Sequence, residues 1–376
     1  MMRIALFYHS LVSDWNHGNA HFLRGIATEL QARGHELRIF EPEDSWSREN
    51  LLRDRGLSAI AGFERTFPKL RSTRYDIHRL QIEEWLDGVD LVIAHEWNDS
   101  KLIAQLGNYR TRNRNVRLLF HDTHHRAMTA EHELARFDLL NYDGVLAYGA
   151  SLKEAYERHG WGKQVYVWHE AADTSVFYPR ECSGDRGDLV WIGNWGDEER
   201  TEELREFFLT PVRKLGLRSQ VFGVRYPDSA LEELRAAAIE YRGWLPNFDV
   251  PGVFACFRAT VHVPRRPYTR QLPGIPTIRP FEALACGIPL ISAPWTDCEG
   301  LFRVGKDFLM ARDGADMSDK IADVLKDDDM ASELGLSGLE TIRKRHTCAH
   351  RVSELLNIYE GIRPASLQPE VAEVGS

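Results

Sequence analysis

Two segments of the sequence combine residue types that could bind a substrate and act on it. The first, residues 119–126, reads Leu-Phe-His-Asp-Thr-His-His-Arg and follows an apolar run. We therefore expect it at the carboxyl end of a buried strand, where it would line a cleft. His121, Asp122 or His124 could there orient an acceptor or accept its proton. The alternatives are a structural or surface role, or a metal site, although no H-E-x-x-H pattern supports a metal.

The second segment, residues 274–295, predicts a turn, a short helix and a buried strand. Pro280 suits the first position of a helix and Gly287 its end. The N-terminus of such a helix offers unpaired N–H groups and a partial positive charge, and Arg279 lies beside it. A diphosphate would fit there, and Glu282 could accept hydrogen bonds from a ribose diol. The alternative is that Glu282 only favours the helix dipole and that Arg279 is a surface charge.

Alternating strands and helices must position these residues. An apolar strand at 3–8, a helix with one apolar face at 22–30 and a strand at 37–40 form a βαβ unit. After a polar linker at 181–188 the alternation restarts with a strand at 189–193. Later helices are expected at 198–215, 228–240, 280–286, 315–326 and 331–362, whereas 41–80 is expected to be a loop with some helix. The fold class is therefore α/β, with two doubly wound domains, each with a mostly parallel sheet, facing a central cleft.

The expected domains are residues 1–182 on the acceptor side and 183–345 on the nucleotide side. A helix at 346–362 would cross back to the first domain, and residues 363–376 are expected to be disordered because they are poor in apolar residues.

Composition excludes several classes of protein. The net charge of -9 argues against a nucleic-acid partner. No G-x-G-x-x-G follows the first strand and no P-loop occurs, so a nicotinamide dehydrogenase or P-loop NTPase is disfavoured. The five cysteines are widely spaced, which argues against a disulfide framework or a structural zinc site. With no signal peptide and no long apolar stretch, a cytoplasmic location is expected.

Several segments, in order along the chain, resemble one family of enzymes. Residues 279–292, R-P-F-E-A-L-A-C-G-I-P-L-I-S, resemble the donor-site motif of GT-B-fold glycosyltransferases, most of all the CgeB-like (spore maturation protein-like) branch related to family 4-like, or group 1, enzymes. Similar matches are Gly18-Asn19 with R-G-H-E at 33–36, the interdomain segment 170–179 and R-H-T-C-A-H-R at 345–351. Together these segments span nearly the whole chain.

The resemblance implies a role for individual residues. Glu282 would hold the nucleotide ribose, and Thr277, Ile278 and Arg279 would meet the diphosphate. Gly193, Asn194 and Trp195 would face the phosphates or the donor sugar. Trp244 and Leu245 would line the base pocket, Gly18 and Asn19 would close on the donor, and His121 would lie near the anomeric carbon. The alternatives are that Trp244 packs under a loop and that Gly193 is an ordinary turn.

The implied activity is transfer of a sugar from a nucleoside diphosphate sugar to an unknown acceptor, which could be a glycan, a lipid, a protein or a small molecule. Metal independence, retention of the anomeric configuration and no cofactor besides the nucleotide sugar are expected. Family 4-like enzymes carry an E-x7-E pair whose first glutamate would fall at Gly274, so the sugar stays open. The alternatives are a sugar-nucleotide epimerase on the same fold and a non-catalytic sugar-nucleotide binder.

Basic residues of the first domain form a possible binding surface. Lys101, Arg110, Arg112, Arg114, Arg117 and Arg126 could meet an anionic acceptor or the periphery of a membrane. The alternative is an ordinary solvated surface.

Overall fold

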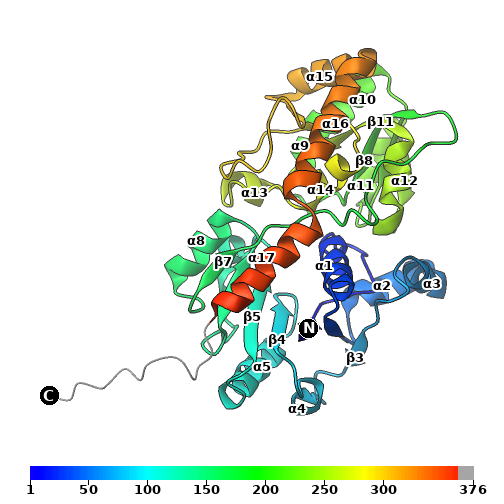
Figure 1. Ribbon diagram of the computed structural model, residues 1–376. Helices are drawn as coiled ribbons and strands as arrows, with labels where there is room; N and C mark the ends of the chain where they lie inside the picture. The colour runs from blue at the N-terminus through cyan, green and yellow to red at the C-terminus, as the bar shows by residue number, and fades with distance from the viewer. Residues whose placement is uncertain (363–376) are drawn as a thin grey trace.

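The computed structural model of the protein describes residues 1–362 and contains two parallel sheets, one in each domain (Figure 1). Residues 363–376, for which disorder was predicted, lie outside the described residues. The first sheet has the order β3 (Thr73–Tyr75), β2 (Glu36–Pro42), β1 (Arg3–Phe7), β4 (Leu91–His95), β5 (Arg117–Asp122), β6 (Gly144–Ala147) and β7 (Val165–Val167). The apolar run of β1 has both faces covered, and Ile4 to Phe7 are fully buried, as central parallel strands require.

The second sheet repeats the same winding. Its order is β10 (Glu240–Gly243), β9 (Ser219–Phe222), β8 (Gly187–Ile192), β11 (Phe257–His262), β12 (Leu290–Ser292) and β13 (Leu309–Met310). All its pairs are parallel, with Val190 of β8 opposite Gln220 of β9 and Thr260 of β11. The predicted α/β class with two doubly wound domains is therefore confirmed.

Helices cover both faces of each sheet (Figure 1). In the first domain they are α1 (Ala20–Ala32), α2 (Trp46–Arg55), α3 (Leu57–Thr66), α4 (Ile82–Trp85), α5 (Ser100–Arg112), α6 (Arg126–Thr129), α7 (Glu131–Leu134) and α8 (Ala150–His159). In the second they are α9 (Thr201–Leu204), the π-helical turn η1 (Arg205–Leu209), α10 (Thr210–Leu215), α11 (Asp228–Ala236), the 3-10 turn η2 (Asn247–Asp249), α12 (Val250–Ala255), α13 (Arg266–Arg270), α14 (Ile278–Ala285), α15 (Gly314–Lys326) and α16 (Asp328–Arg345). The last helix is α17 (Cys348–Gly361).

Two helix predictions were wrong at their ends. The helix predicted for 228–240 stops at Ala236 because Glu240–Gly243 pairs with β9 as an edge strand. The single helix predicted for 331–362 is two helices, α16 and α17, separated at His346 and Thr347. Thr347 adopts an extended conformation and caps α17 in a capping box with His350, so a new helix begins there.

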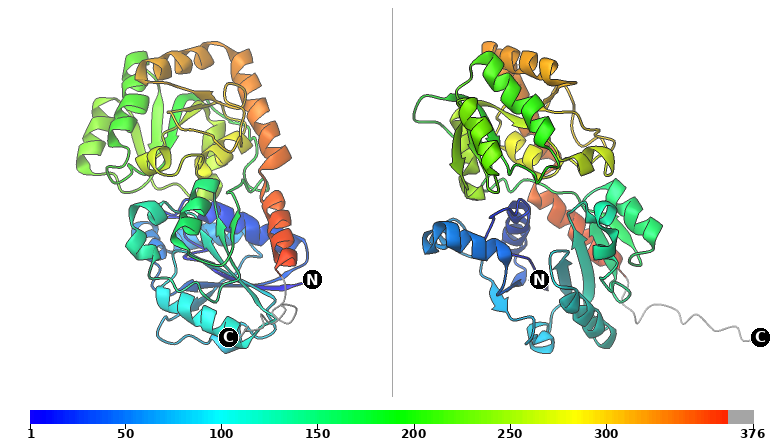
Figure 2. Two further views of the ribbon diagram at one scale, coloured as in Figure 1. Left: turned by 90° about the vertical axis from the view of Figure 1, so that its left-hand side faces the viewer. Right: turned by 180° about the vertical axis from the view of Figure 1, so that it is seen from behind.

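The chain crosses between the domains at two neighbouring places, and the two crossings are hydrogen-bonded to each other. Ala172 donates its N–H to the carbonyl of His346, 2.9 Å away, and accepts the N–H of Cys348 at 3.0 Å. Beyond the second crossing α17 packs against α1, and the Trp168 indole donates to the carbonyl of Arg351. Figure 2 shows α17 running from the second domain along the first.

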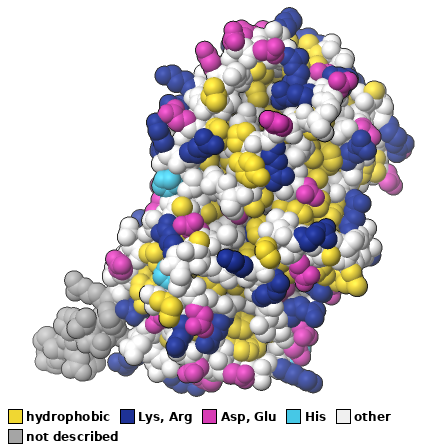
Figure 3. Space-filling model, turned by 45° about the vertical axis from the view of Figure 1, so that its right-hand side comes forward, with side chains coloured by type: hydrophobic (Ala, Val, Ile, Leu, Met, Phe, Trp, Pro, Cys, Tyr) yellow, Lys and Arg dark blue, Asp and Glu magenta, His cyan; other side chains and the backbone are white. Residues whose placement is uncertain are grey.

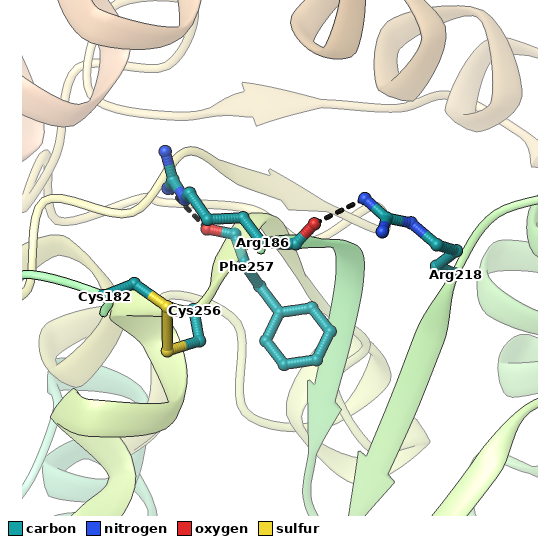
Figure 4. The surroundings of a disulfide bond; sticks show 5 residues. All are labelled: Cys182, Arg186, Arg218, Cys256 and Phe257. Carbon is teal, nitrogen blue, oxygen red and sulfur yellow. Dashed lines mark hydrogen bonds between the residues drawn. A yellow bond between two sulfur atoms is a disulfide. The ribbon is translucent and has the colours of Figure 1, made fainter. Parts of the chain in front are cut away.

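A disulfide joins Cys182 to Cys256, a pairing that the wide spacing of the cysteines did not predict (Figure 4). The linker after the first domain runs back beside the start of β11, which brings residues 74 positions apart to a Cα–Cα distance of 5.0 Å. Arg186 donates to the carbonyl of Phe257 at the same place. Cys286, Cys298 and Cys348 are free thiols.

Three of the six basic residues proposed as a binding surface of the first domain are paired with acids. Arg110 contacts Asp143 at 2.8 Å, Arg112 contacts Glu83 at 2.5 Å, and Arg126 contacts Glu96 and Glu133. Figure 3 shows charges of both signs intermixed on the face it presents. These pairs favour an ordinary solvated surface. Among residues 1–362 no helix is both long enough and apolar enough to cross a membrane.

Candidate active site

A cavity of about 710 Å³ lies between the domains, where the carboxyl ends of both sheets face each other. From the second domain, residues directly after β8, β9, β10 and β11 line it, because parallel strands deliver their following loops to one edge. From the first domain, the loop after β1 and the loops after β4, β5 and β6 complete the wall. The cavity is large enough for a nucleotide with an attached sugar.

Three arginines give the wall of the second domain a positive charge. Arg200, Arg265 and Arg279 all line the cavity. Arg200 donates to the backbone and side-chain oxygens of Asn194, at 2.9 and 2.7 Å, whereas its Nε is buried without a hydrogen-bond partner among residues 1–362. Burial, followed by the nearby Arg265 charge, lowers the pKa of Arg200 to about 9. An anion between the guanidinium groups would relieve this repulsion and supply the missing acceptor.

The N-terminus of α14 opens onto the same part of the cavity. The helix starts at Ile278, two residues before the predicted position of Pro280, and Thr277 to Arg279 line the cavity as a unit. The N–H groups of this first turn have no acceptor within the helix. Thr277 has a φ of 60° and a ψ of -177°, a conformation that favours glycine and is found in non-glycine residues mainly at functional sites.

Glu282 lies beneath this turn and not on the cavity surface. Its carboxylate is fully buried, with His21 Nδ1 at 2.8 Å and Asn247 Nδ2 at 2.7 Å from Oε1, and Arg279 on Oε2. The N–H of Asp173 donates to His21 Nε2, so His21 carries its proton on Nδ1 and donates to Glu282. Burial raises the pKa of Glu282, but the Arg279 charge and the hydrogen bonds from His21 and Asn247 outweigh it and hold the pKa below its ordinary value. Glu282 therefore fixes Arg279 and Asn247, both of which line the cavity.

The loop after β8 separates into cavity and core residues. Gly193 and Asn194 line the cavity, and the tight approach of Gly223 to the Gly193 carbonyl leaves no room for a side chain at Gly223. Trp195 points the other way: it is 4% exposed and packs against Tyr226, with ring centroids 5.6 Å apart. It belongs to the core of the second domain.

Residues of the first domain reach across to the second. Gly18 lines the cavity, and a Cβ there would lie 3.6 Å from Ile278, while Asn19 donates to Thr123 and contacts His95.

Trp244 and Leu245 of the second domain also line the cavity. The Trp244 indole donates to Asp14 at 3.0 Å, which shows that the aromatic ring is held by the first domain instead of packing under its own loop.

Of the predicted catalytic residues, only His124 reaches the cavity. His121 is 1% exposed and packs against Trp168 and His95, and burial lowers its pKa to about 3. Asp122 is also buried, and its carboxylate accepts from the Tyr156 hydroxyl at 2.6 Å and from the N–H of His124. Asp122 therefore positions the loop that carries His124.

Two arginines of the cavity wall, Arg200 and Arg265, were not among the predicted site residues. Arg265 follows β11 by three residues, so the rule that ligands bind at the carboxyl ends of parallel strands could have identified it. Arg200 was assigned to the charged helix predicted for 198–215, which begins only at Thr201. It lies instead in the loop that returns to the cavity.

Gly274 faces a crowded corner. Its φ is +90°, and an added Cβ would lie 2.5 Å from Cys298 Sγ and 3.4 Å from Glu299 Oε1. The backbone conformation and the packing both require glycine at this position.

Among residues 1–362 no group of three or more His, Cys, Asp or Glu side chains is arranged to hold a metal ion.

Comparisons with known proteins agree with this architecture. Residues 200–357 match a protein family described as "Glycosyl transferase-like". An α-glucosyltransferase solved with UDP has a TM-score of 0.68 at 13% identity, covering 96% of this chain and 100% of that one. Anabaena HepE, solved with UDP and glucose, has a TM-score of 0.65 at 13% identity, with coverage of 96% and 100%. Sucrose-phosphate synthase from Thermosynechococcus elongatus has a TM-score of 0.62 at 14% identity, with coverage of 96% and 99%. No curated protein sequence matches the chain.

The structural likenesses confirm the predicted GT-B fold over nearly the whole chain. The family match assigns a glycosyl transferase-like domain to most of the second half. Together they agree with the class of enzyme predicted from the sequence, a glycosyltransferase.

Proposed function

We propose that the protein binds a nucleoside diphosphate sugar in the cavity between its domains and transfers the sugar to an acceptor there, with retention and without a metal ion. The observation that carries the proposal is the group Arg200, Arg265 and Arg279 beside the N-terminus of α14, at the edge where the second sheet delivers its loops. Two of the structural neighbours were solved with UDP, so UDP is the first nucleotide to test. Membership of the CgeB-like branch and a cytoplasmic location remain predictions.

The arginines would act on the leaving group. As the bond from the anomeric carbon to the diphosphate breaks, negative charge builds up on the diphosphate oxygens. Guanidinium groups fixed by Asn194, Glu199 and Glu282 can stabilise that charge without reorganising. A partly enclosed cavity would strengthen the interaction and limit hydrolysis of the donor. This preorganised positive charge is the role that a metal ion has in other transferases.

The base and the ribose would lie at the other end of this edge. Trp244 and Leu245 follow β10 and offer an apolar wall for a base. For the ribose, Asn247 reaches the cavity directly. Glu282, which is buried beneath the cavity wall, would act on the ribose through Asn247, whose side-chain amide it holds. His124 would face the acceptor from the first domain.

Nucleotide binding by wild-type protein and by the Arg265→Ala variant tests the proposal. A charged hydrogen bond contributes about 1.5 to 3 kcal/mol, so the variant should bind UDP roughly 10- to 100-fold more weakly in calorimetric titration. Arg312→Ala removes an exposed arginine on the second domain and should leave UDP binding unchanged. A wild-type protein that binds no nucleotide diphosphate would refute the proposed function.

Product analysis then separates the possible reactions. Free UDP that appears only when an acceptor is present supports transfer. A changed sugar on an intact diphosphate would identify an epimerase, and binding without turnover would identify a non-catalytic binder.

A further inference from the structure

Glu170 is a buried carboxyl that the proposed mechanism does not use. It lies on the segment that leads from β7 to the first domain crossing, and it lines the cavity although only 5% of its surface is exposed. Its Oε2 is buried and has no hydrogen-bond partner in the described part of the chain. The hydroxyl of Tyr148, another lining residue, is also buried without a partner.

Among the buried carboxyls of the first domain, Glu41 and Asp122 accept hydrogen bonds on both oxygens, and Glu96 and Asp173 accept them on one. Glu41 accepts the N–H of Leu11 at 2.7 Å and the hydroxyls of Ser10 and Ser72, and Asp122 accepts from Tyr156. Burial, followed by the Glu282 charge, raises the pKa of Glu170 to about 8. An unpaired carboxyl in a cavity wall is destabilising, and a ligand that donates hydrogen bonds to it would explain why it is there.

The strand order indicates which part of a donor would reach Glu170. Along the sheet, Trp244 follows β10, Arg200 follows β8, and Arg265 follows β11. A nucleoside diphosphate laid along this edge with its base at Trp244 and its phosphates at the arginines extends its sugar past β11. There α13 carries Tyr268, whose ring lies 6.2 Å from that of Tyr148. Burial raises the pKa of Tyr268, and the Glu170 charge adds to this.

A second acidic residue near this part of the cavity, Glu299, already has hydrogen-bond partners. The Glu299 carboxylate accepts the N–H of Ala150 at 2.9 Å and contacts His169 at 2.8 Å, so it braces the two domains against each other. Gly274, which lies against Glu299, has no side chain to offer. Glu170, the residue after His169, is left facing the cavity.

We propose that Glu170 binds hydroxyl groups of the transferred sugar and selects a neutral, hydroxyl-bearing sugar over an anionic one. This inference rests on the proposed function, since it places a nucleoside diphosphate sugar in the cavity. Burial keeps Glu170 mostly protonated at neutral pH, and hydrogen bonds donated by sugar hydroxyls would favour its charged form. A uronic acid would instead bring a further negative charge close to Glu170 and Glu282.

Comparing sugar nucleotides with the bare nucleotide tests the proposal. The probes are UDP, UDP-glucose, UDP-galactose, UDP-N-acetylglucosamine and UDP-glucuronate, titrated calorimetrically into wild type, Glu170→Gln and Glu170→Ala. Wild type should bind one neutral UDP-sugar at least tenfold more tightly than UDP-glucuronate. Both variants should bind that sugar nucleotide roughly tenfold or more weakly than wild type does, yet bind UDP within about twofold of wild type.

Glu41→Gln is the matched control, because it changes a buried carboxyl that does not line the cavity. It should lower the unfolding temperature and leave the ratio of UDP-sugar to UDP affinity unchanged, whereas Glu170→Gln should fold with undiminished stability. If UDP binds and the Glu170 variants keep the wild-type ratio, the assignment of Glu170 is overturned while the proposed function stands. If wild type binds no nucleotide at all, the proposed function fails first.

Discussion

The backbone at Gly274 makes a clear prediction about a single side chain. Gly274→Ala places a Cβ 2.5 Å from Cys298 Sγ at a φ of +90°, so we expect a loss of about 2 to 4 kcal/mol in the free energy of unfolding. Gly300→Ala is the matched control: its φ is +62° and nothing lies within 4 Å, so only backbone strain of roughly 1 kcal/mol should appear. Urea denaturation of both variants measures the difference. Equal losses would show that the packing at Gly274 does not matter.

For single residues, the sequence predicted which backbone segments lie at the cavity better than it predicted which side chains point into it. The expected helix N-terminus pointed to Arg279, and the family resemblance pointed to Gly193, Asn194, Thr277 and Ile278; all five line the cavity. The orientation of a side chain depends on packing that no local pattern encodes. Trp195 and His121 thus turned into the core although their neighbours Asn194 and His124 face the cavity. The burial of Glu282 depends on His21, 261 positions earlier in the chain.

Among the elements, α17 depends on its cap. Thr347→Ala removes the hydroxyl that accepts the N–H of His350, and the loss of an N-cap typically destabilises a helix by about 1 kcal/mol. Hydrogen exchange should therefore become faster in the first turn of α17. Thr111→Ala, on the exposed face of α5, should leave exchange in α17 unchanged. Unchanged protection of residues 348–352 in Thr347→Ala would contradict the prediction.

The linker is an element held by a covalent bond, and thiol counting tests that bond. Unfolded, unreduced protein should show three reactive thiols, those of Cys286, Cys298 and Cys348, and reduction should raise the number to five. Before unfolding, Cys298 should react first because it is exposed. Five thiols without reduction would mean that Cys182 and Cys256 are unlinked.

Apolar periodicity and turn residues were sufficient to predict the central strands and their order, since strands buried on both faces are continuous apolar runs. The edge strands β3, β10 and β13 are short and were not predicted. Boundaries were harder to predict. The end of α11 depends on pairing between β10 and β9, and the interruption before α17 depends on the bridge from Ala172 to Thr347. Both are contacts between distant segments, as is the approach of Cys182 to Cys256.

Across the whole molecule, buried neutral histidines should make stability depend on pH. Burial is the main cause that lowers the pKa to about 3 for His17, His121, His262 and His346. Unfolding lets each group take up a proton below pH 6.5, so stability is present above that pH and is lost as the pH falls towards 3. Asp122 and Glu170 have raised pKa values, of about 6 and 8, so their protonation stabilises the folded protein as the pH falls. These two carboxyls oppose the effect of the four histidines only in part.

Each proton taken up changes the free energy of unfolding by about 1.4 kcal/mol per pH unit. We therefore expect a loss of roughly 2 to 4 kcal/mol between pH 6.5 and pH 5, measured by urea denaturation. A midpoint that stays constant or rises over this range would show that the histidines are already charged in the folded protein.

The paired crossings at Ala172 and Thr347 restrict how the two halves of the molecule can move. Two adjacent chain segments joined by hydrogen bonds act as a hinge between the domains. Rotation of the domains about this hinge is therefore easier than sliding of one domain past the other. Opening is then smallest beside this hinge, where His21 of α1 contacts both Glu282 and the N–H of Asp173.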